Sequence, residues 1–169
     1  MGQQTGFYPI FLDLGQRKCV VVGGGPVAER KAAGLLEAGA EVTIVSPDVT
    51  QGLQRLVESG DVRLLERAFE ETDLEGATLA FAATDSQGVN QAVSDAASRS
   101  GIPVNIADRS NRGDFIVPSS FRKGPLQVAI STGGGSPALA RIIRQDLEHA
   151  VADELVELAQ MLERLRPRV

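Results

Sequence analysis

Residues 20–31 read VVVGGGPVAERK, and this stretch decides the fold expected for the chain. A run of valines enters three glycines, and a pattern rich in Ala, Leu and Lys follows with helical spacing. Strand, glycine turn and helix in this order open the βαβ unit that binds dinucleotides. Gly23 suits the tight turn, Gly25 leaves no Cβ in the way of a pyrophosphate, and Ala28 replaces the third glycine of the motif.

The start of the following helix fits an anion. Pro26 suits a first helical turn because it has no N–H to lose there, and the free N–H groups beyond it attract phosphate. A glycine-rich strand end also occurs as a plain tight turn, so the motif alone leaves that alternative open. Its place in the first βα turn, followed by an apolar strand at 41–45, favours nucleotide binding.

Strand and helix patterns alternate up to residue 106, after an apolar lead-in at 7–12 that we expect to pack beside or pair with the first strand. This alternation predicts a parallel sheet with helices on both faces and a ligand at the carboxyl ends of the strands. Strands are expected at 17–22, 41–45, 62–65, 78–83 and 102–106, and helices at 27–38, 49–59 and 86–100.

The pattern changes after residue 108, where two strands are expected at 114–118 and 126–131, followed by helices at 138–148 and 151–165. A two-stranded hairpin is a poor domain by itself, so this region is expected to dimerise. The predicted class is α/β, a Rossmann-type parallel sheet with a small α+β dimerisation region and a short helical C-terminus. The expected division is 1–112, 113–148 and 149–169.

Composition narrows the classes of function. The 169 residues carry a net charge of -5, which argues against a nucleic-acid partner, and no run is long enough to span a membrane. Residues 1–11 lack a basic region followed by an apolar one, so no signal peptide is expected. The single cysteine, Cys19, allows no disulfide within one chain. A cytoplasmic location is the resulting expectation.

The charge is unevenly distributed. Residues 109–144 contain six Lys or Arg residues and one Asp, a local net charge of +5. A basic region in an acidic protein can attract a polyanionic small molecule, and a solvated surface or the rim of a dimer interface is the alternative.

The second strand ends without the acidic residue that usually follows the glycines by about 20 positions. Ser46 stands near that place and Asp48 follows two residues later, so either could meet the adenine-side ribose. Asp48 could equally serve as a helix N-terminal residue. No Lys or Arg stands there to bind a 2′-phosphate, which favours NAD over NADP.

Two aspartates follow later strands. Asp85 is expected to cap the next helix, with Thr84 and neighbouring backbone contacting the cofactor. Asp108 comes after the fifth strand beside Arg109, and no helix begins there for it to cap. Near a nicotinamide it could take a proton or orient a substrate, and an ion pair with a nearby arginine is the alternative.

A second glycine-rich stretch, STGGGS at 131–136, leads into a helix. It could bind carboxylates through backbone N–H groups, or it could be a flexible connection with Ser136 as an ordinary N-cap. His149 is the only histidine and no Cys/His cluster exists, so no metal site is predicted and a Ser-His-Asp triad is excluded.

Together these stretches resemble a known family. The segments that carry the resemblance are VVVGGGPVAERK, AATD followed by VNQAVSDAA, PVNIAD, and DFIVPSSFRKGPLQVAISTGGGSPALAR. They are similar to the precorrin-2 dehydrogenase/sirohydrochlorin ferrochelatase family, the N-terminal module of siroheme synthase. The resemblance implies a homodimer that oxidises precorrin-2 to sirohydrochlorin with NAD. In many members ferrous iron is then inserted as a second substrate. The short C-terminal part leaves that second step open here.

The resemblance also assigns residues. The family's essential aspartate falls on Asp108, as general base or proton acceptor. A regulatory NAD-binding module without turnover is the alternative function, although it would not explain the stretches at 105–108 and 131–141. NAD contacts fall on Gly25, Pro26, Val27, Pro47 and Asp48, with Thr84 and Asn105 lining the same cleft. The tetrapyrrole is expected near Ser131, Thr132, Gly133, Gly134, Ser136 and Pro137, with its carboxylates favouring the basic region that includes Arg109 and Arg141.

Overall fold

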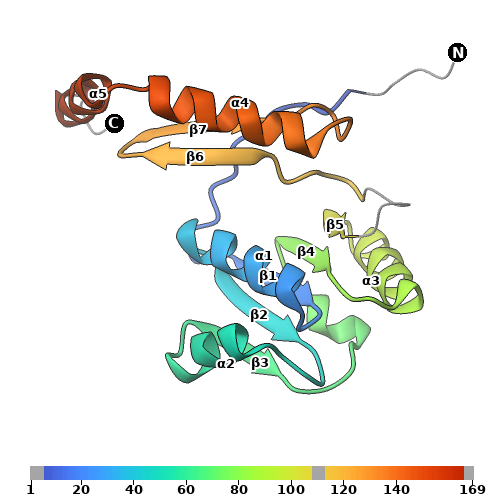
Figure 1. Cartoon of the computed structure of the whole chain (residues 1–169). Coiled ribbons are helices and arrows are strands. Elements are labelled where there is room, and N and C mark those ends of the chain that lie inside the picture. The colour runs from blue at the N-terminus through green and yellow to red at the C-terminus, as the bar shows by residue number, and fades with distance from the viewer. Residues whose placement is uncertain (1–5, 108–112, 166–169) are drawn as a thin grey trace, which may run out of the picture. The chain divides into compact units, whose positions relative to one another are not determined.

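The computed structural model describes residues 6–107 and 113–165, so the predicted site residues Asp108 and Arg109 lie outside the described residues. The chain divides into two compact units. The first unit comprises residues 9–116, and the second combines residues 117–165 with the segment that precedes residue 9. Figure 1 labels the strands and α-helices of both units.

The first unit is built on a five-stranded parallel sheet with the order β3-β2-β1-β4-β5. Strand order reverses between β1 and β4, and open α/β sheets bind their ligands at this switch point. All five expected strands are present, and two have the expected bounds. The strands are β1 Lys18–Val22, β2 Glu41–Val45, β3 Val62–Leu65, β4 Leu79–Ala82 and β5 Val104–Ile106; the helices are α1 Pro26–Glu37, α2 Gln51–Glu58, the 3-10 helix η1 Glu71–Leu74 and α3 Gln87–Arg99.

The two faces of this sheet bury separate apolar clusters. Alternate residues of a strand point to opposite faces, so Val21 packs with α1 and α2 while Val20 packs with α3 and η1. Both valines are completely buried. The helices therefore lie on both faces, α1 and α2 on one and α3 on the other, as the alternating sequence pattern predicts (Figure 1).

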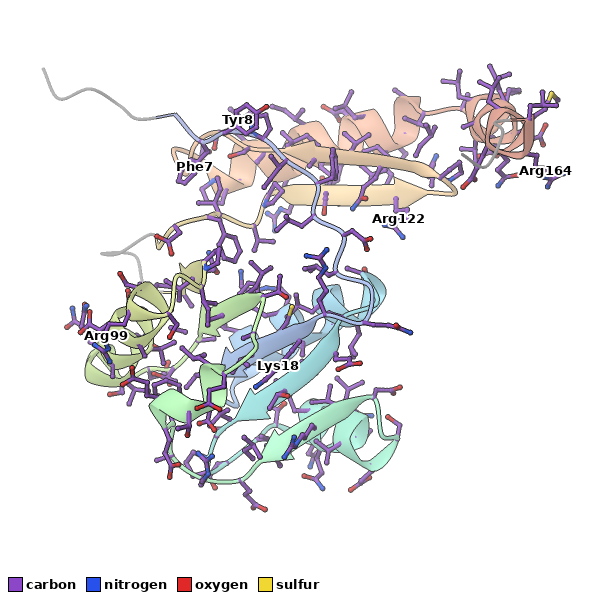
Figure 2. The ribbon with its side chains drawn as sticks, turned by 180° about the vertical axis from the view of Figure 1, so that it is seen from behind. Phe7, Tyr8, Lys18, Arg99, Arg122 and Arg164 are labelled. Carbon is purple, nitrogen blue, oxygen red and sulfur yellow. The ribbon has the colours of Figure 1, made fainter. Side chains whose placement is uncertain are left out.

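Charged side chains fasten η1 near the start of β1. Lys18, labelled in Figure 2, donates from Nζ to the carbonyl oxygens of Asp73 at 2.9 Å and Glu75 at 2.7 Å. The Asp73 carboxylate forms an ion pair with Arg67 at 2.6 Å and also accepts a hydrogen bond from the backbone N–H of Glu70. The pKa of the Asp73 carboxyl is lowered, because these partners outweigh the opposing effect of burial.

The second unit consists of an antiparallel hairpin and two helices, which are β6 Ser119–Lys123, β7 Leu126–Ile130, α4 Pro137–Ala150 and α5 Asp153–Leu165. The expectation of a strand at 114–118 was wrong, since β6 begins at Ser119. Asp114 is instead bound to β5, where its N–H donates to the carbonyl oxygen of Val104 and its carboxylate accepts from the Val104 N–H. The neighbouring Phe115 ring packs edge-on against Phe81 of β4.

Apolar side chains of the second unit are mostly exposed. Among its described residues, only Phe121 and Ala140 are buried hydrophobics. The lead-in at 7–12 was also wrongly expected to pack beside β1, because it forms no strand and its side chains are exposed. The large exposed hydrophobics of α4 and α5 are Leu139, Ile142, Leu147, Leu155, Leu158, Met161, Leu162 and Leu165.

Candidate functional site

The glycine loop after β1 joins the ends of three strands. Gly23 adopts a φ of 127°, a left-handed conformation that favours glycine. A Cβ there would lie 2.7 Å from the carbonyl carbon of Ala83 at the end of β4. The N–H of Gly23 donates to the carbonyl oxygen of Val45 at the end of β2. Gly23 thus permits the close approach of these strand ends, in agreement with its expected role in the turn.

Gly24 has a role that the sequence reasoning missed. A Cβ at this position would lie 2.7 Å from Ser46 Oγ and 2.9 Å from the carbonyl carbon of Asp48. Its carbonyl oxygen accepts a hydrogen bond of 2.9 Å from the N–H of Thr50. The signal available in the sequence was the third glycine, because a GxGxxA pattern needs none at this position.

Gly25 and the start of α1 leave open space in which an anion could bind. Gly25 is the N-cap of α1 with a φ of -82°, and no side chain caps the helix. A Cβ on Gly25 would meet no atom within 4 Å, and Pro26 occupies the first helical turn. Val27 follows Pro26, and Ala28 is completely buried against the sheet. An uncapped helix N-terminus without a side chain beside it fits the pyrophosphate of a dinucleotide.

The two residues predicted to contact the ribose, Ser46 and Asp48, differ in their exposure. Ser46 is buried and its hydroxyl donates to the carbonyl oxygen of Asp48 at 2.7 Å, whereas Pro47 and Asp48 are exposed. Thr50, and not Asp48, is the N-cap of α2, since its Oγ1 accepts from the N–H of Leu53. The Asp48 carboxylate is thus not used as the helix cap, and its contact with a ribose stays a prediction.

The segment after β4 is organised by a buried amide. The expectation that Asp85 caps α3 was wrong, because Ser86 is the N-cap and accepts from the N–H of Val89. Asn90, which is 5% exposed, accepts from the N–H of Thr84 and donates to its carbonyl oxygen at 2.9 Å. Asn90 was missed, although an amide among the inward-facing apolar positions of this helix was a signal for it.

Asn105 lies in β5 opposite Phe81 and is buried. Its Nδ2 donates to the carbonyl oxygen of Phe115 at 2.8 Å, so the amide holds the segment that returns along β5. β5 leads to Ala107, whose N–H donates to the carbonyl oxygen of Ala82. The chain therefore reaches the position before Asp108 in register with the end of β4.

In the second unit, the STGGGSP stretch is an ordered turn. Ser131 Oγ accepts from the N–H of Gly133 at 3.0 Å, and Thr132 Oγ1 accepts from the N–H of Ser136 at 2.9 Å. Ser136 Oγ caps α4 by accepting from the N–H of Leu139, and both Gly133 and Gly134 have positive φ angles. Ser131 and Thr132 act as acceptors in these bonds, so these bonds do not use their hydroxyl protons.

Several Lys and Arg side chains of the basic region at 109–144 are already bound to other groups of the protein. Lys123 Nζ donates to the carbonyl oxygen of Val151, and Arg144 forms an ion pair with Glu148 four residues along α4. Arg122, labelled in Figure 2, bonds the side chain of Gln127 across the hairpin, and Arg141 on α4 is exposed. Within residues 6–107 and 113–165, no three His, Cys, Asp or Glu side chains are grouped so that they could hold a metal ion.

Comparisons with known proteins agree with this geometry. A family described as "Putative NAD(P)-binding" matches residues 10–119, and one described as "Sirohaem biosynthesis protein central" matches residues 123–150. The siroheme synthase of Methylococcus capsulatus is 45% identical over 163 residues, which are 96% of this chain and 34% of the relative. That of Salmonella paratyphi A is 45% identical over 161 residues, 95% of this chain and 35% of the relative. The chain thus spans about a third of the length of these relatives.

A solved structure of SirC, a precorrin-2 dehydrogenase, matches with a TM-score of 0.78 and 32% identity over 96% of this chain and 83% of that chain. The parallel sheet, the glycine loop and the open start of α1 define a dinucleotide-binding protein of the Rossmann class. With both units matched, the chain belongs to the family of precorrin-2 dehydrogenases and siroheme synthase N-terminal modules. None of its described helices is long and apolar enough to cross a membrane.

Proposed function

We propose that this chain oxidises precorrin-2 to sirohydrochlorin with NAD as the hydride acceptor. The observation that carries the proposal is the match to SirC, which extends over 83% of that precorrin-2 dehydrogenase and therefore includes more than the nucleotide-binding unit. NAD supplies the two-electron chemistry by accepting a hydride from the macrocycle, and a proton is released from the substrate. The protein must then bind both molecules, orient them and take up that proton.

The glycine loop and α1 are the proposed pyrophosphate site. Gly23 shapes the turn, and Gly25, Pro26 and Val27 present the uncapped N-terminus of α1 to the anion. Asp48 is the proposed partner of the ribose hydroxyl groups on the adenine side, since it is exposed and does not cap the neighbouring helix. A carboxylate there would repel the 2′-phosphate of NADP, which favours NAD.

The second unit carries the proposed contacts to the carboxylates of the tetrapyrrole. Ser131 and Thr132 retain hydroxyl protons to donate, and Arg141 is an exposed cation on the helix that the same turn opens. Replacing Arg141 with Ala should raise the KM for precorrin-2, and unchanged kinetics would count against this contact.

We also propose a homodimer formed through the second unit. Its described residues bury only two hydrophobic side chains and leave a row of leucines on α5 exposed. A second copy offers the same apolar surface, and burying it would supply the core that the hairpin and helices do not form alone. Light scattering after gel filtration should give twice the chain mass, and a monomer at micromolar concentration would refute the proposal.

Anaerobic turnover of precorrin-2 tests the function. The protein should form NADH in step with the absorption spectrum of sirohydrochlorin. We assign proton uptake to Asp108, so Asp108→Ala should bind NAD normally and lose turnover. Asp95→Ala is a matched control on the exposed surface of α3, where Asp95 accepts a hydrogen bond from Gln91 and interacts with the charge of Arg99, and it should retain turnover. NAD binding without NADH formation would instead support the regulatory module.

Ferrous iron added after the oxidation is complete tests the second step. The siroheme synthase relatives motivate this measurement. Siroheme formation faster than in an enzyme-free control would add the chelatase activity. A rate equal to the control would leave a dehydrogenase alone.

A further inference from the structure

Glu29 makes a contact that the proposed cofactor site does not explain. It lies in the first turn of α1, and its Oε2 accepts a hydrogen bond of 2.5 Å from Oγ1 of Thr50, at the start of α2. The same Oγ1 accepts from the N–H of Leu53. The hydroxyl proton of Thr50 is therefore directed to Glu29 while its lone pair caps α2. The cap itself does not require the carboxylate.

The absence of a side chain at Gly52 leaves the space that the Glu29 carboxylate occupies. A Cβ on Gly52 would lie 2.6 Å from Oε2 of Glu29 and closer still to Cδ and Oε1, so any side chain there would displace the carboxylate. Gly52 is the second residue of α2, where glycine has a lower helix propensity than alanine. Glycine at position 52 is explained by the space that the Glu29 carboxylate needs there.

Thr50 connects this contact to the cofactor loop. Its N–H donates to the carbonyl oxygen of Gly24 at 2.9 Å, and Gly24 packs directly on the backbone of Asp48. At the other end of the segment, Ser46 Oγ donates to the carbonyl oxygen of Asp48. The exposed residues 47–48 thus lie between two fixed points, the end of β2 and Thr50. Glu29 of α1 fixes Thr50 by accepting its hydroxyl hydrogen bond.

We propose that Glu29 is a positioning residue for the dinucleotide, which it serves by fixing Thr50 and thereby the distance between Asp48 and the glycine loop. This inference rests on the proposed function, since it presupposes that NAD spans these two segments. A dinucleotide must place its pyrophosphate and its adenine-side ribose at the same time. A segment held in advance at the correct spacing spares the ordering cost that would otherwise weaken binding.

The test uses the full chain and two matched pairs of variants, with NAD affinity measured by calorimetry and kinetics measured with precorrin-2. Glu29→Ala removes the acceptor, whereas Glu29→Gln retains an oxygen that can accept from Thr50. Gly52→Ala forces the carboxylate away, whereas Gly34→Ala introduces the same methyl group in α1, where nothing lies within 4 Å.

We expect Glu29→Ala and Gly52→Ala to weaken NAD binding by up to about tenfold, because the segment that Thr50 holds would then have to be ordered when NAD binds. Their KM for NAD should rise while kcat and the KM for precorrin-2 stay within about twofold. Glu29→Gln and Gly34→Ala should bind NAD like the wild type. In a Glu29→Ala background, Gly52→Ala should add little, because the clash it creates is no longer present.

Three results would overturn the inference, and they differ in what they mean for the proposed function. If the wild type binds NAD normally and Glu29→Ala does too, Glu29 does not position the cofactor, and the proposed function stands. If kcat falls in parallel with affinity and melting temperature, Glu29 is only a structural residue. A wild type that does not bind NAD would remove the proposed function together with the inference.

Discussion

Lys31 of α1 is held in a position that disfavours its charge. Its ammonium nitrogen lies 5.5 Å from the centre of the Phe81 ring, and the side chain is half-buried against the sheet. Burial, with a smaller contribution from Arg30, lowers the pKa of Lys31 from 10.5 to about 8. Attraction between the ammonium group and the ring acts in the opposite direction.

The sign of the effect on stability follows from proton binding. The unfolded chain binds a proton at Lys31 up to about pH 10.5, and the folded chain binds it only up to about pH 8. Between these values the unfolded state carries more protons, so stability should rise with pH. Below pH 8 both states are charged and the full cost of the buried ammonium is present.

The size of this cost can be bounded. Each pKa unit corresponds to about 1.4 kcal/mol, so the difference between 10.5 and about 8 sets a ceiling of about 3 kcal/mol. Solvent at the half-buried end and attraction to Phe81 reduce the cost, and we expect about 1 to 2 kcal/mol. Replacing Lys31 with Met keeps the apolar stem, so Lys31→Met should be more stable than the wild type at pH 7 by that amount.

Urea unfolding followed by far-ultraviolet circular dichroism measures this, because the chain has no tryptophan to report by fluorescence. The advantage of Lys31→Met should shrink between pH 8 and pH 10.5. Lys31→Arg stays charged over this range and should fall behind the wild type as the pH rises. A Lys31→Met advantage of the same size at pH 7 and pH 10.5 would refute the reasoning, because packing alone would then explain it.

Two further predictions concern buried polar groups. Asp73→Asn should destabilise the chain by about 2 kcal/mol at pH 7, since it removes the ionised partner of Arg67, and the difference should shrink as the pH falls below 4 and through the lowered pKa of Asp73; urea unfolding at pH 7 and pH 3 checks this. Asn90→Ala should cost about 2 kcal/mol and raise the KM for NAD, because the N–H and carbonyl of Thr84 lose their partner; unfolding and NAD kinetics check both effects.

The sheet was predictable because its pattern is local. Each strand of the first unit is a short apolar run between turn residues, and β2 at Glu41–Val45 and β3 at Val62–Leu65 have the bounds expected from the sequence. The hairpin was misplaced because the segment at 114–118 is as apolar as a strand. What decides its structure is the pairing of Asp114 with Val104, ten residues earlier, which no local pattern contains.

For the candidate cofactor site, too, the features set by a local motif were predicted better than those set by contacts with other segments. Gly23 and the open N-terminus of α1 were found from the motif, since their requirements are those of the turn itself. Gly24 was missed because its role depends on Ser46 and Asp48, more than 20 residues later in the sequence. Asn90 was missed although its partner Thr84 lies only six residues earlier, because a polar residue on the inward face of a helix was not examined as a buried group. Asp108 stays a prediction that rests on the family resemblance and on its place after β5.

The end of β2 shows why a serine, and not the acidic residue usual in this fold, stands at position 46. Ser46 occupies the customary place, is buried, and donates its hydroxyl to the carbonyl oxygen of Asp48. A carboxylate at position 46 would have no proton to donate to that oxygen and would meet the backbone that packs on Gly24. The next acidic side chain is Asp48, two residues later, and its contact with a ribose stays a prediction. The chain there turns back onto the glycine loop, where Thr50 holds it. Gly24, Ser46 and the backbone of Asp48 thus form one structural arrangement, so a spacing rule that looks for an acid at position 46 does not test the proposed role of Asp48.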